Sequence, residues 1–205
     1  MQSLTSQSEH RSDKADASST RILDCAAKLF RQQGYASVTL RQIAAAAGMK
    51  AGSVYYHFDS KEVIVSEILN RGIAVVHNEV SQVFKSQPDN AQAGEVIHAC
   101  IEAHLRSLFT YSDYTSANVR IYSQVPPHVR EANRKARRGY EQLWDRILKR
   151  ANEQDALRDD LDNRHARLML ISSLNATLEW FDPKRGSIKT LSRNYSDLLL
   201  KGLLK

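Results

Sequence analysis

The sequence predicts an all-α protein of about nine helices, and three features of the chain support this. Only 8 Gly and 4 Pro interrupt the 205 residues, so long stretches rich in Ala, Leu, Arg, Lys and Glu favour helices. Apolar residues recur at helical spacing, and no segment alternates as a strand would. Hydrophobic residues make up 42% of the chain, which is enough to bury a sizeable core.

Recognisable caps and breaks set the order of the helices. Gly34 ends a first helix as a left-handed C-cap, and Thr39 with Gln42 forms a capping box that opens the second. Gly48 closes that helix, and Pro126-Pro127 makes a sharp corner further along. The predicted helices span residues 20–33, 39–47, 50–57, 60–85, 91–111, 116–122, 128–153, 163–181 and 187–204.

The chain divides into a polar arm, a small N-terminal unit and a larger C-terminal unit. Residues 1–18 are polar and lack the apolar stretch of a signal peptide, so we expect a disordered arm there. Residues 19–65 hold three short helices, and residues 66–205 form the second unit. The fourth helix, which runs to about residue 85, links the two units.

Charge and cysteine content narrow the class of protein. The chain carries 29 Lys and Arg against 23 Asp and Glu, a formal net charge of +6, which fits a polyanionic partner. Between residues 21 and 61, six basic residues face two acidic ones, so the N-terminal unit holds most of this excess. The only cysteines are Cys25 and Cys100, and no run is apolar enough to span a membrane, which favours a cytoplasmic protein with reduced thiols.

The second and third predicted helices have the spacing of a helix-turn-helix, with a tight turn at Gly48-Met49. On a helical wheel of the third helix, Val54 and Phe58 lie together and pack inward. Gly52 and Tyr56 point the opposite way, so the outward face carries little bulk and a phenol.

Ser53 and Tyr55 flank this outward face of the third helix. A surface of small residues, a hydroxyl and phenols can approach a nucleic-acid groove closely and donate hydrogen bonds to phosphates or base edges. Taken singly, the aromatics of this helix also suit an ordinary core, but their combination with the cap, the turn and nearby cations favours DNA binding.

Residues 39–58 have the sequence Thr-Leu-Arg-Gln-Ile-Ala-Ala-Ala-Ala-Gly-Met-Lys-Ala-Gly-Ser-Val-Tyr-Tyr-His-Phe, and Asp-Ser-Lys-Glu follows them. This segment resembles the TetR family of repressors. The likeness covers residues 20–69 and is highly specific. It implies three N-terminal helices that bind DNA and a variable helical domain that dimerises and holds an inducer. The function so implied is a transcriptional regulator, by family default a repressor, released from a pseudo-palindromic operator by a small molecule.

The resemblance also assigns roles to individual residues of this segment. The implied base contacts come from the start of the recognition helix and its most outward side chain: Lys50, Ala51, Gly52, Ser53 and Tyr56. The implied phosphate contacts and groove-edge positions are Thr39, Arg41, Tyr55, His57 and Lys61. Ala51 departs from the family pattern, because many members place Lys or Arg there and this chain loses that guanine contact. Lys50 can substitute, although Ser or Thr often caps the helix at its position.

The last two predicted helices are the most apolar of the chain, which suits either an intramolecular core or an interface. By resemblance they pair with their copies in a twofold four-helix homodimer. Such a dimer presents two recognition helices about 34–36 Å apart, one for each half-site of the operator.

By resemblance, an inducer pocket lies among the middle helices, where aromatic residues gather. The candidate lining residues are Phe109, Tyr122, Tyr140, Trp144, Glu179 and Trp180, with Tyr111, Tyr114 and Phe181 as further aromatics. Most of these aromatics also fit an ordinary core.

The C-terminal segments 175–183 and 195–202 resemble a subgroup that includes repressors of sterol-degradation genes, which sense coenzyme A thioesters. The implied inducer is therefore an acyl-CoA thioester or another hydrophobic or aromatic compound. A run of cations could receive its phosphates, although such a run is more often a solvated helix face. The run consists of Arg130, Arg134, Lys135, Arg137 and Arg138.

Other classes of protein fit the sequence less well. His98, Cys100 and His104 do not have the spacing of a metal site, since His98 points away from the other two on a helix, and a core histidine is the better interpretation. No nucleophile elbow or phosphate-binding loop indicates an enzyme, and we expect neither a metal nor a cofactor. The alternative is a helical adaptor or ligand-binding protein without DNA binding.

Overall fold

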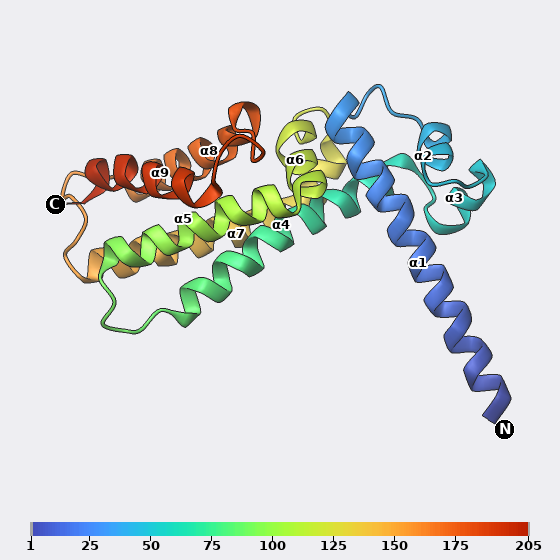
Figure 1. Cartoon of the computed structure of the whole chain (residues 1–205), viewed down its shortest axis with the longest axis horizontal. Helices are drawn as coiled ribbons and strands as arrows, with labels where there is room; N and C mark the ends of the chain where they lie inside the picture. Colours follow the sequence, from blue (N-terminus) through green and yellow to red (C-terminus); the bar gives the residue numbers. More distant parts are fainter. Residues whose placement is uncertain (1, 205) are drawn as a thin grey trace.

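The computed structural model describes residues 2–204, with the side chains of residues 15–111 and 113–204. Within these residues the chain forms nine helices and no strand, so the predicted all-α class is confirmed (Figure 1). The helices are α1 (Gln2–Gln33), α2 (Leu40–Ala46), α3 (Ala51–His57), α4 (Lys61–Ser86), α5 (Ala93–Thr110), α6 (Ser112–Ile121), α7 (Pro127–Glu153), α8 (Asn163–Trp180) and α9 (Ile188–Leu203).

The first helix is longer than predicted. It begins at Gln2, where the sequence predicted a disordered arm over residues 1–18, and its first turns project from the body of the molecule (Figure 1). No Gly or Pro occurs before Gly34, so nothing in the backbone chemistry ends the helix early. The arm prediction is wrong for residues 2–18, and Met1 lies outside the described residues.

The predicted helix ends are confirmed where side-chain chemistry sets them. Gly34 and Gly48 adopt the positive φ angles of 79° and 66° that favour glycine. Thr39 forms the expected capping box: its backbone N–H donates to Gln42 Oε1 at 2.7 Å and its hydroxyl accepts from Gln42 N at 3.3 Å. The start of α6 was misplaced, because it follows α5 after Tyr111 alone and no breaker marks that bend.

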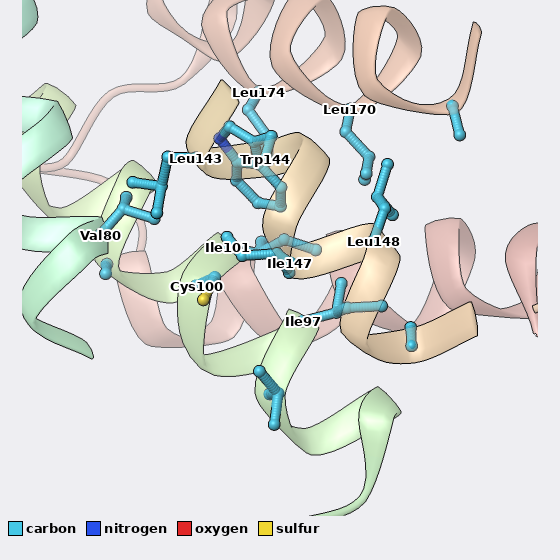
Figure 2. Close-up of a cluster of buried hydrophobic side chains, with 14 of the residues drawn as sticks. Val80, Ile97, Cys100, Ile101, Leu143, Trp144, Ile147, Leu148, Leu170 and Leu174 are labelled. Carbon is cyan, nitrogen blue, oxygen red and sulfur yellow. The ribbon is translucent and has the colours of Figure 1, made fainter. Parts of the chain in front are cut away.

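Two hydrophobic cores organise the molecule. One joins α1, α2 and α3 to the first turns of α4 and to α6, and the other joins α5, α7, α8 and α9 to the rest of α4. Figure 2 shows the second core, in which Trp144 lies among Ile101, Leu143 and Leu174. The proposed domain boundary at residue 65 falls inside α4, which packs into both cores.

The helix-turn-helix and the pair α8–α9 lie at opposite ends of the molecule, and α6 lies between them (Figure 1). In residues 2–204 none of the helices combines the length and the apolar character that crossing a membrane requires.

Candidate nucleic-acid interface and ligand cavity

The inner face of α3 fixes the helix to its domain. Val54 is fully buried and Phe58 nearly so, both in the core that they share with Ile43 of α2. The turn between the helices is closed by the backbone bond from Met49 N to Ala44 O, at 2.9 Å. The sequence-based assignment of these inward residues is confirmed.

The outer face of α3 is unusually open. Tyr56 is 83% exposed and Tyr55 is 56% exposed, although large aromatic side chains tend to be buried. Gly52 and Ser53 are exposed beside them, and a Cβ at Gly52 would have no heavy atom within 4 Å. His57 packs edge-on against the Tyr56 ring at 5.2 Å. The face therefore offers hydroxyl groups and a site where another backbone can approach closely.

Cations and a capped helix end surround this face. Arg41 and Lys50 are exposed, and Lys50 makes no side-chain cap for α3. Ala51 is half-buried at the first turn. The exposed Thr39 hydroxyl donates to Gln42 Oε1 at 2.8 Å while it caps α2, so its hydrogen is already engaged.

Lys61 has an internal role that the sequence did not reveal. Its Nζ donates to the carbonyl oxygens of Tyr35 and Val38, at 3.1 and 3.0 Å, and lies 4.1 Å from the centre of the Tyr35 ring. The Tyr35 hydroxyl donates to Glu62 Oε1 at 3.1 Å, and burial together with this carboxylate raises the pKa of Tyr35 to about 12. Lys61 thus holds the loop between α1 and α2, with one of its three N–H groups left over.

A cavity of about 90 Å³ lies among α4, α5, α6, α7 and α8. Its lining combines apolar side chains with polar groups that converge from four helices. The lining residues are Gly72, Ile73, Val76, His104, Leu108, Thr115, Asn118, Val119, Arg137, Tyr140, Glu141, Leu168, Ile171, Ser172 and Asn175.

Of the six predicted ligand residues, only Tyr140 lines this cavity. Trp144 is fully buried in the core, and Phe109 packs against Phe181 with ring centroids 5.1 Å apart. Tyr122 lies under the Arg137 guanidinium, 3.5 Å from ring centroid to Cζ. Trp144 and Tyr140 both pack against His104, whereas Phe109 and Tyr122 lie elsewhere, so the six predicted residues do not gather at one cavity.

The other two predicted ligand residues lie near the end of α8, outside the cavity. Glu179 is exposed and accepts a hydrogen bond from Arg120 Nε at 3.1 Å. Trp180 is 58% exposed and stacks on Tyr195 of α9, with ring centroids 6.1 Å apart. Glu179 therefore does not line this cavity, although the sequence suggested it as a candidate.

The polar end of the cavity centres on His104, whose place in the core was predicted. Its Nδ1 lies 2.5 Å from the Tyr140 hydroxyl and its Nε2 lies 3.3 Å from Asn175 Oδ1. Burial lowers the pKa of His104 to about 4 and raises the pKa of Tyr140, so both groups are neutral at neutral pH. The roles of His104 and Asn175 were missed, since no local motif marks them.

Arg137 turns inward from the predicted cationic run. Its Nε donates to Asn133 Oδ1 at 3.0 Å, and its Nη2 donates to the backbone oxygen and Oδ1 of Asn118, at 3.1 and 2.6 Å. Burial lowers the pKa of Arg137. Arg134, by contrast, is exposed and pairs with Glu131 at 2.7 Å, so most of the run is a solvated face.

The helix α6 connects the cavity to the helix-turn-helix. Thr115, Asn118 and Val119 of α6 line the cavity. On the same helix, Asp113 pairs with Arg31 of α1 at 2.7 Å, and the Tyr114 hydroxyl donates to Asp24 of α1 at 2.6 Å. Any movement of α6 therefore acts directly on α1.

Gly72 explains how closely α6 packs on α4. A Cβ at this position would lie 2.6 Å from the backbone oxygen of Tyr114, closer than real contacts allow, and 3.0 Å from the Asn118 Cβ, which is tighter than most. Asn118 also donates from Nδ2 to the Leu69 backbone oxygen. Together these contacts hold α6 against α4 at the boundary between the two cores.

The pair α8–α9 leaves apolar side chains in solvent. Leu198 is 73% exposed, and Leu168 and Met169 are nearly half exposed. Trp180 is a fourth exposed apolar side chain of this pair, and exposed apolar groups that gather on one surface commonly mark an interaction site. Within the part of the chain that the structure describes, no group of three or more His, Cys, Asp or Glu side chains is placed to hold a metal ion.

This geometry defines a class of protein: a helix-turn-helix regulator that carries a separate helical domain with an internal cavity. The chain matches two family descriptions, "Bacterial regulatory proteins, tetR family" over residues 22–68 and "Tetracyclin repressor-like, C-terminal domain" over residues 90–203. The second match alone covers more than half of the chain, so the protein belongs to the TetR family and is a DNA-binding transcriptional regulator.

Relatives and solved structures agree with this assignment. The HTH-type transcriptional repressor KstR2 of Rhodococcus jostii (strain RHA1) is 28% identical over 190 residues, which cover 90% of each chain. The regulator PfmR from Thermus thermophilus is 28% identical with a TM-score of 0.77, over 88% of this chain and 97% of that one. AibR, solved with isovaleryl coenzyme A and operator DNA, shares the fold at a TM-score of 0.79 and 19% identity, over 89% of this chain and 98% of its own. Nothing in these comparisons supports an adaptor without DNA binding.

Proposed function

We propose that this protein is a homodimeric repressor that leaves a pseudo-palindromic operator when a hydrophobic ligand enters the cavity beneath α6. The observation that carries the proposal is the position of α6, which lines the cavity with Thr115, Asn118 and Val119 and pairs with α1 through Asp113 and Tyr114. A ligand that displaces α6 changes the position of α1, and with it the position of α3.

In this proposal the outer face of α3 enters the major groove. Gly52 and Ser53 allow close approach at the base edges, and Tyr56 is the side chain that reaches furthest. Tyr55, His57 and Lys61 contact phosphates, Arg41 lies at the groove edge, and Lys50 stays at the bases. Thr39 can donate to a phosphate only if its hydroxyl leaves Gln42. Ala51 is half-buried and adds no charge to the bases.

The dimer forms through α8 and α9. The exposed apolar side chains Leu168, Met169, Trp180 and Leu198 support this surface, because burial against a second copy removes them from water. A twofold dimer of this kind places two α3 helices on one side of the DNA, one or more turns of the duplex apart.

The inducer in this proposal is an acyl-CoA thioester or another compound with a hydrophobic body. The solved AibR complex, which contains isovaleryl coenzyme A, supports the thioester for a protein of this fold. A cavity of about 90 Å³ is smaller than the roughly 300–1,000 Å³ of most ligand pockets. A ligand of this class must therefore enlarge the cavity, and α6, like α4, joins the cavity to the DNA-binding core.

The test begins with a duplex selected from a random DNA library by the full-length protein. Fluorescence anisotropy then measures how a panel of acyl-CoA thioesters and hydrophobic acids changes the affinity for that duplex. We expect at least one compound to release the protein from DNA. In Gly72→Ala, whose new methyl group displaces α6 from α4, we expect weaker DNA binding even without a compound. Wild-type DNA affinity in Gly72→Ala would contradict the role of α6.

A further inference from the structure

We infer that the polar end of the cavity binds the acceptor oxygens of an acyl group, a carboxylate or an acyl carbonyl, through N–H groups of Asn175 and Arg137. The inference rests on the proposed function, in which this same cavity receives the inducer. It assigns the chemistry that the ligand must present, and it follows from the order of hydrogen bonds around His104.

The hydrogen bonds around His104 run in one direction. Asn175 Oδ1 can only accept, so the His104 Nε2 that faces it at 3.3 Å carries the ring hydrogen. A neutral imidazole has a single N–H, so Nδ1 is an acceptor and takes the hydrogen of the Tyr140 hydroxyl at 2.5 Å. The hydrogens of Tyr140 and His104 are thus both used within the protein.

Donors are left over at this end of the cavity. With its oxygen occupied by His104, Asn175 presents its amide NH2 group, which has two N–H donors, and its side chain lines the cavity. Trp144 adds no donor here, because its indole N–H lies in the core, where it opposes the rise in the pKa of Tyr140 that burial causes.

Arg137 adds a cation to the same lining. Its described hydrogen bonds engage Nε and Nη2, and every acceptor is a neutral oxygen of Asn133 or Asn118. Glu141, one turn further along α7, also lines the cavity; its carboxylate lies 3.8 Å from Arg167 Nη2 and also acts on Arg137, where it opposes the fall in pKa that burial causes. The Nη1 group of Arg137 takes no part in these bonds and is suited to an anionic or strongly polar oxygen.

The rest of the cavity lining indicates the chemistry of the other half of the ligand. Ile73, Val76, Leu108 and Ile171 give it apolar walls, which suit a short branched or cyclic hydrocarbon group. A ligand alcohol or amine would bring further donors to an end where the protein already has donors to spare. An acyl group brings oxygen acceptors instead and leaves its hydrocarbon part on the apolar walls.

The test is isothermal titration of the full-length protein, without DNA, with five compounds of one carbon skeleton. They are 4-methylpentanoate, its N-acetylcysteamine thioester, 4-methylpentanoyl coenzyme A, 4-methylpentan-1-ol and 4-methylpentylamine. We expect at least one acyl compound to bind about tenfold or more tightly than the alcohol and the amine. The strongest acyl compound identifies the source of the oxygen, as a free carboxylate or a thioester carbonyl. Equal binding of the alcohol or amine, or no binding by any compound, would overturn the inference.

The variant Asn175→Asp keeps the side-chain size but replaces the donor group with an acceptor. We expect it to weaken the best acyl compound by about tenfold or more, with a smaller loss in the same direction for Asn175→Ala. Asn152→Asp makes the same change at an exposed position near the end of α7, outside the cavity lining; it is the matched control and should bind as the wild type does. Circular dichroism confirms that each variant is folded. Wild-type affinity in a folded Asn175→Asp would overturn the assignment.

The two proposals fail separately. If acyl compounds bind but never release the protein from DNA, the proposed coupling is wrong and the acyl site stands. If DNA is released only by compounds that have no acceptor oxygen, the regulator function stands and the acyl site is wrong.

Discussion

Single side chains on α3 form the face that we propose reads DNA. Gly52 and Ser53 leave the backbone open, whereas Tyr55 and Tyr56 place phenols in solvent where burial would be the norm. Other residues act indirectly, and Lys61 is the clearest case, because it clasps the loop that leads into α2. The exposed residues of α3 and the loop-holding Lys61 come from one short stretch of sequence. A helical wheel identifies the exposed residues of α3, but it does not reveal the contacts of Lys61.

Lys61→Ala should weaken binding to all DNA sequences alike. Loss of the ammonium frees the carbonyl groups of Tyr35 and Val38 and removes the N–H that remains for a phosphate. We expect the slope of log affinity against log salt to fall by about one unit, as for one phosphate contact. An unchanged slope would mean that Lys61 serves only to hold the loop.

His104 should make stability depend on pH. Its pKa is lowered to about 4 in the fold, from 6.5 in the unfolded chain, so between these values the unfolded state binds more protons. The contribution is fully present above pH 6.5 and is lost as the pH falls towards 4, by at most roughly 3 kcal/mol. Urea unfolding across this range should show a smaller pH dependence for His104→Gln. Parallel pH curves for the two proteins would contradict the buried neutral imidazole.

At the scale of helices, the sequence predicts a helix end best where a residue at that end caps or stops the helix by itself. The Thr39 capping box and the positive φ angles of Gly34 and Gly48 are local, so the pattern of residues predicts them. The break between α5 and α6 depends on packing around Tyr111, with no Gly or Pro to mark it, and the prediction missed it. The length of α1 was missed for the opposite reason, since polar composition was taken as disorder although no breaker is present.

Gly48 and Gly52 offer a matched pair of substitutions to Ala. Gly48 has a φ of 66°, so Gly48→Ala should cost about 1–2 kcal/mol of stability through backbone strain. Gly52 lies in a helix with open space around it, so Gly52→Ala should stabilise α3 by up to about 1 kcal/mol. Its methyl group should nevertheless weaken DNA binding, because it lies on the face that we propose approaches the groove. Thermal unfolding and anisotropy together check both effects, and unimpaired DNA binding by Gly52→Ala would argue against this face.

At the scale of the whole molecule, function depends on contacts between distant segments. The sequence could predict an aromatic-rich helical domain, but of the six residues chosen for the pocket only Tyr140 lines the cavity. His104, Asn175 and Arg137 meet there from three helices, and nothing in their local sequence distinguishes them from core or surface positions. Helical periodicity indicates which face is buried, but it does not indicate which neighbour that face will meet.

The dimer is predicted to depend on the exposed apolar surface of α8 and α9. Leu198→Glu puts a charge on a side chain that is 73% exposed here and that the proposed dimer would bury. We expect a folded monomer by light scattering, and a loss of affinity for a full operator of roughly hundredfold, because two linked half-site contacts become one. Gln82→Glu, exposed on α4, adds the same charge elsewhere and should stay dimeric. A dimeric Leu198→Glu would place the interface on another surface.

The central claim is that the outer face of α3 reads DNA sequence, and selection from a random duplex library tests it most directly. The wild-type protein should enrich a pseudo-palindrome with half-site centres one or more duplex turns apart. Tyr56→Ala and Ser53→Ala should enrich altered half-sites, whereas Tyr55→Phe should keep the wild-type sequence at lower affinity. If the wild type enriches no sequence, or if all three variants select the wild-type half-site at wild-type affinity, the account of α3 is wrong.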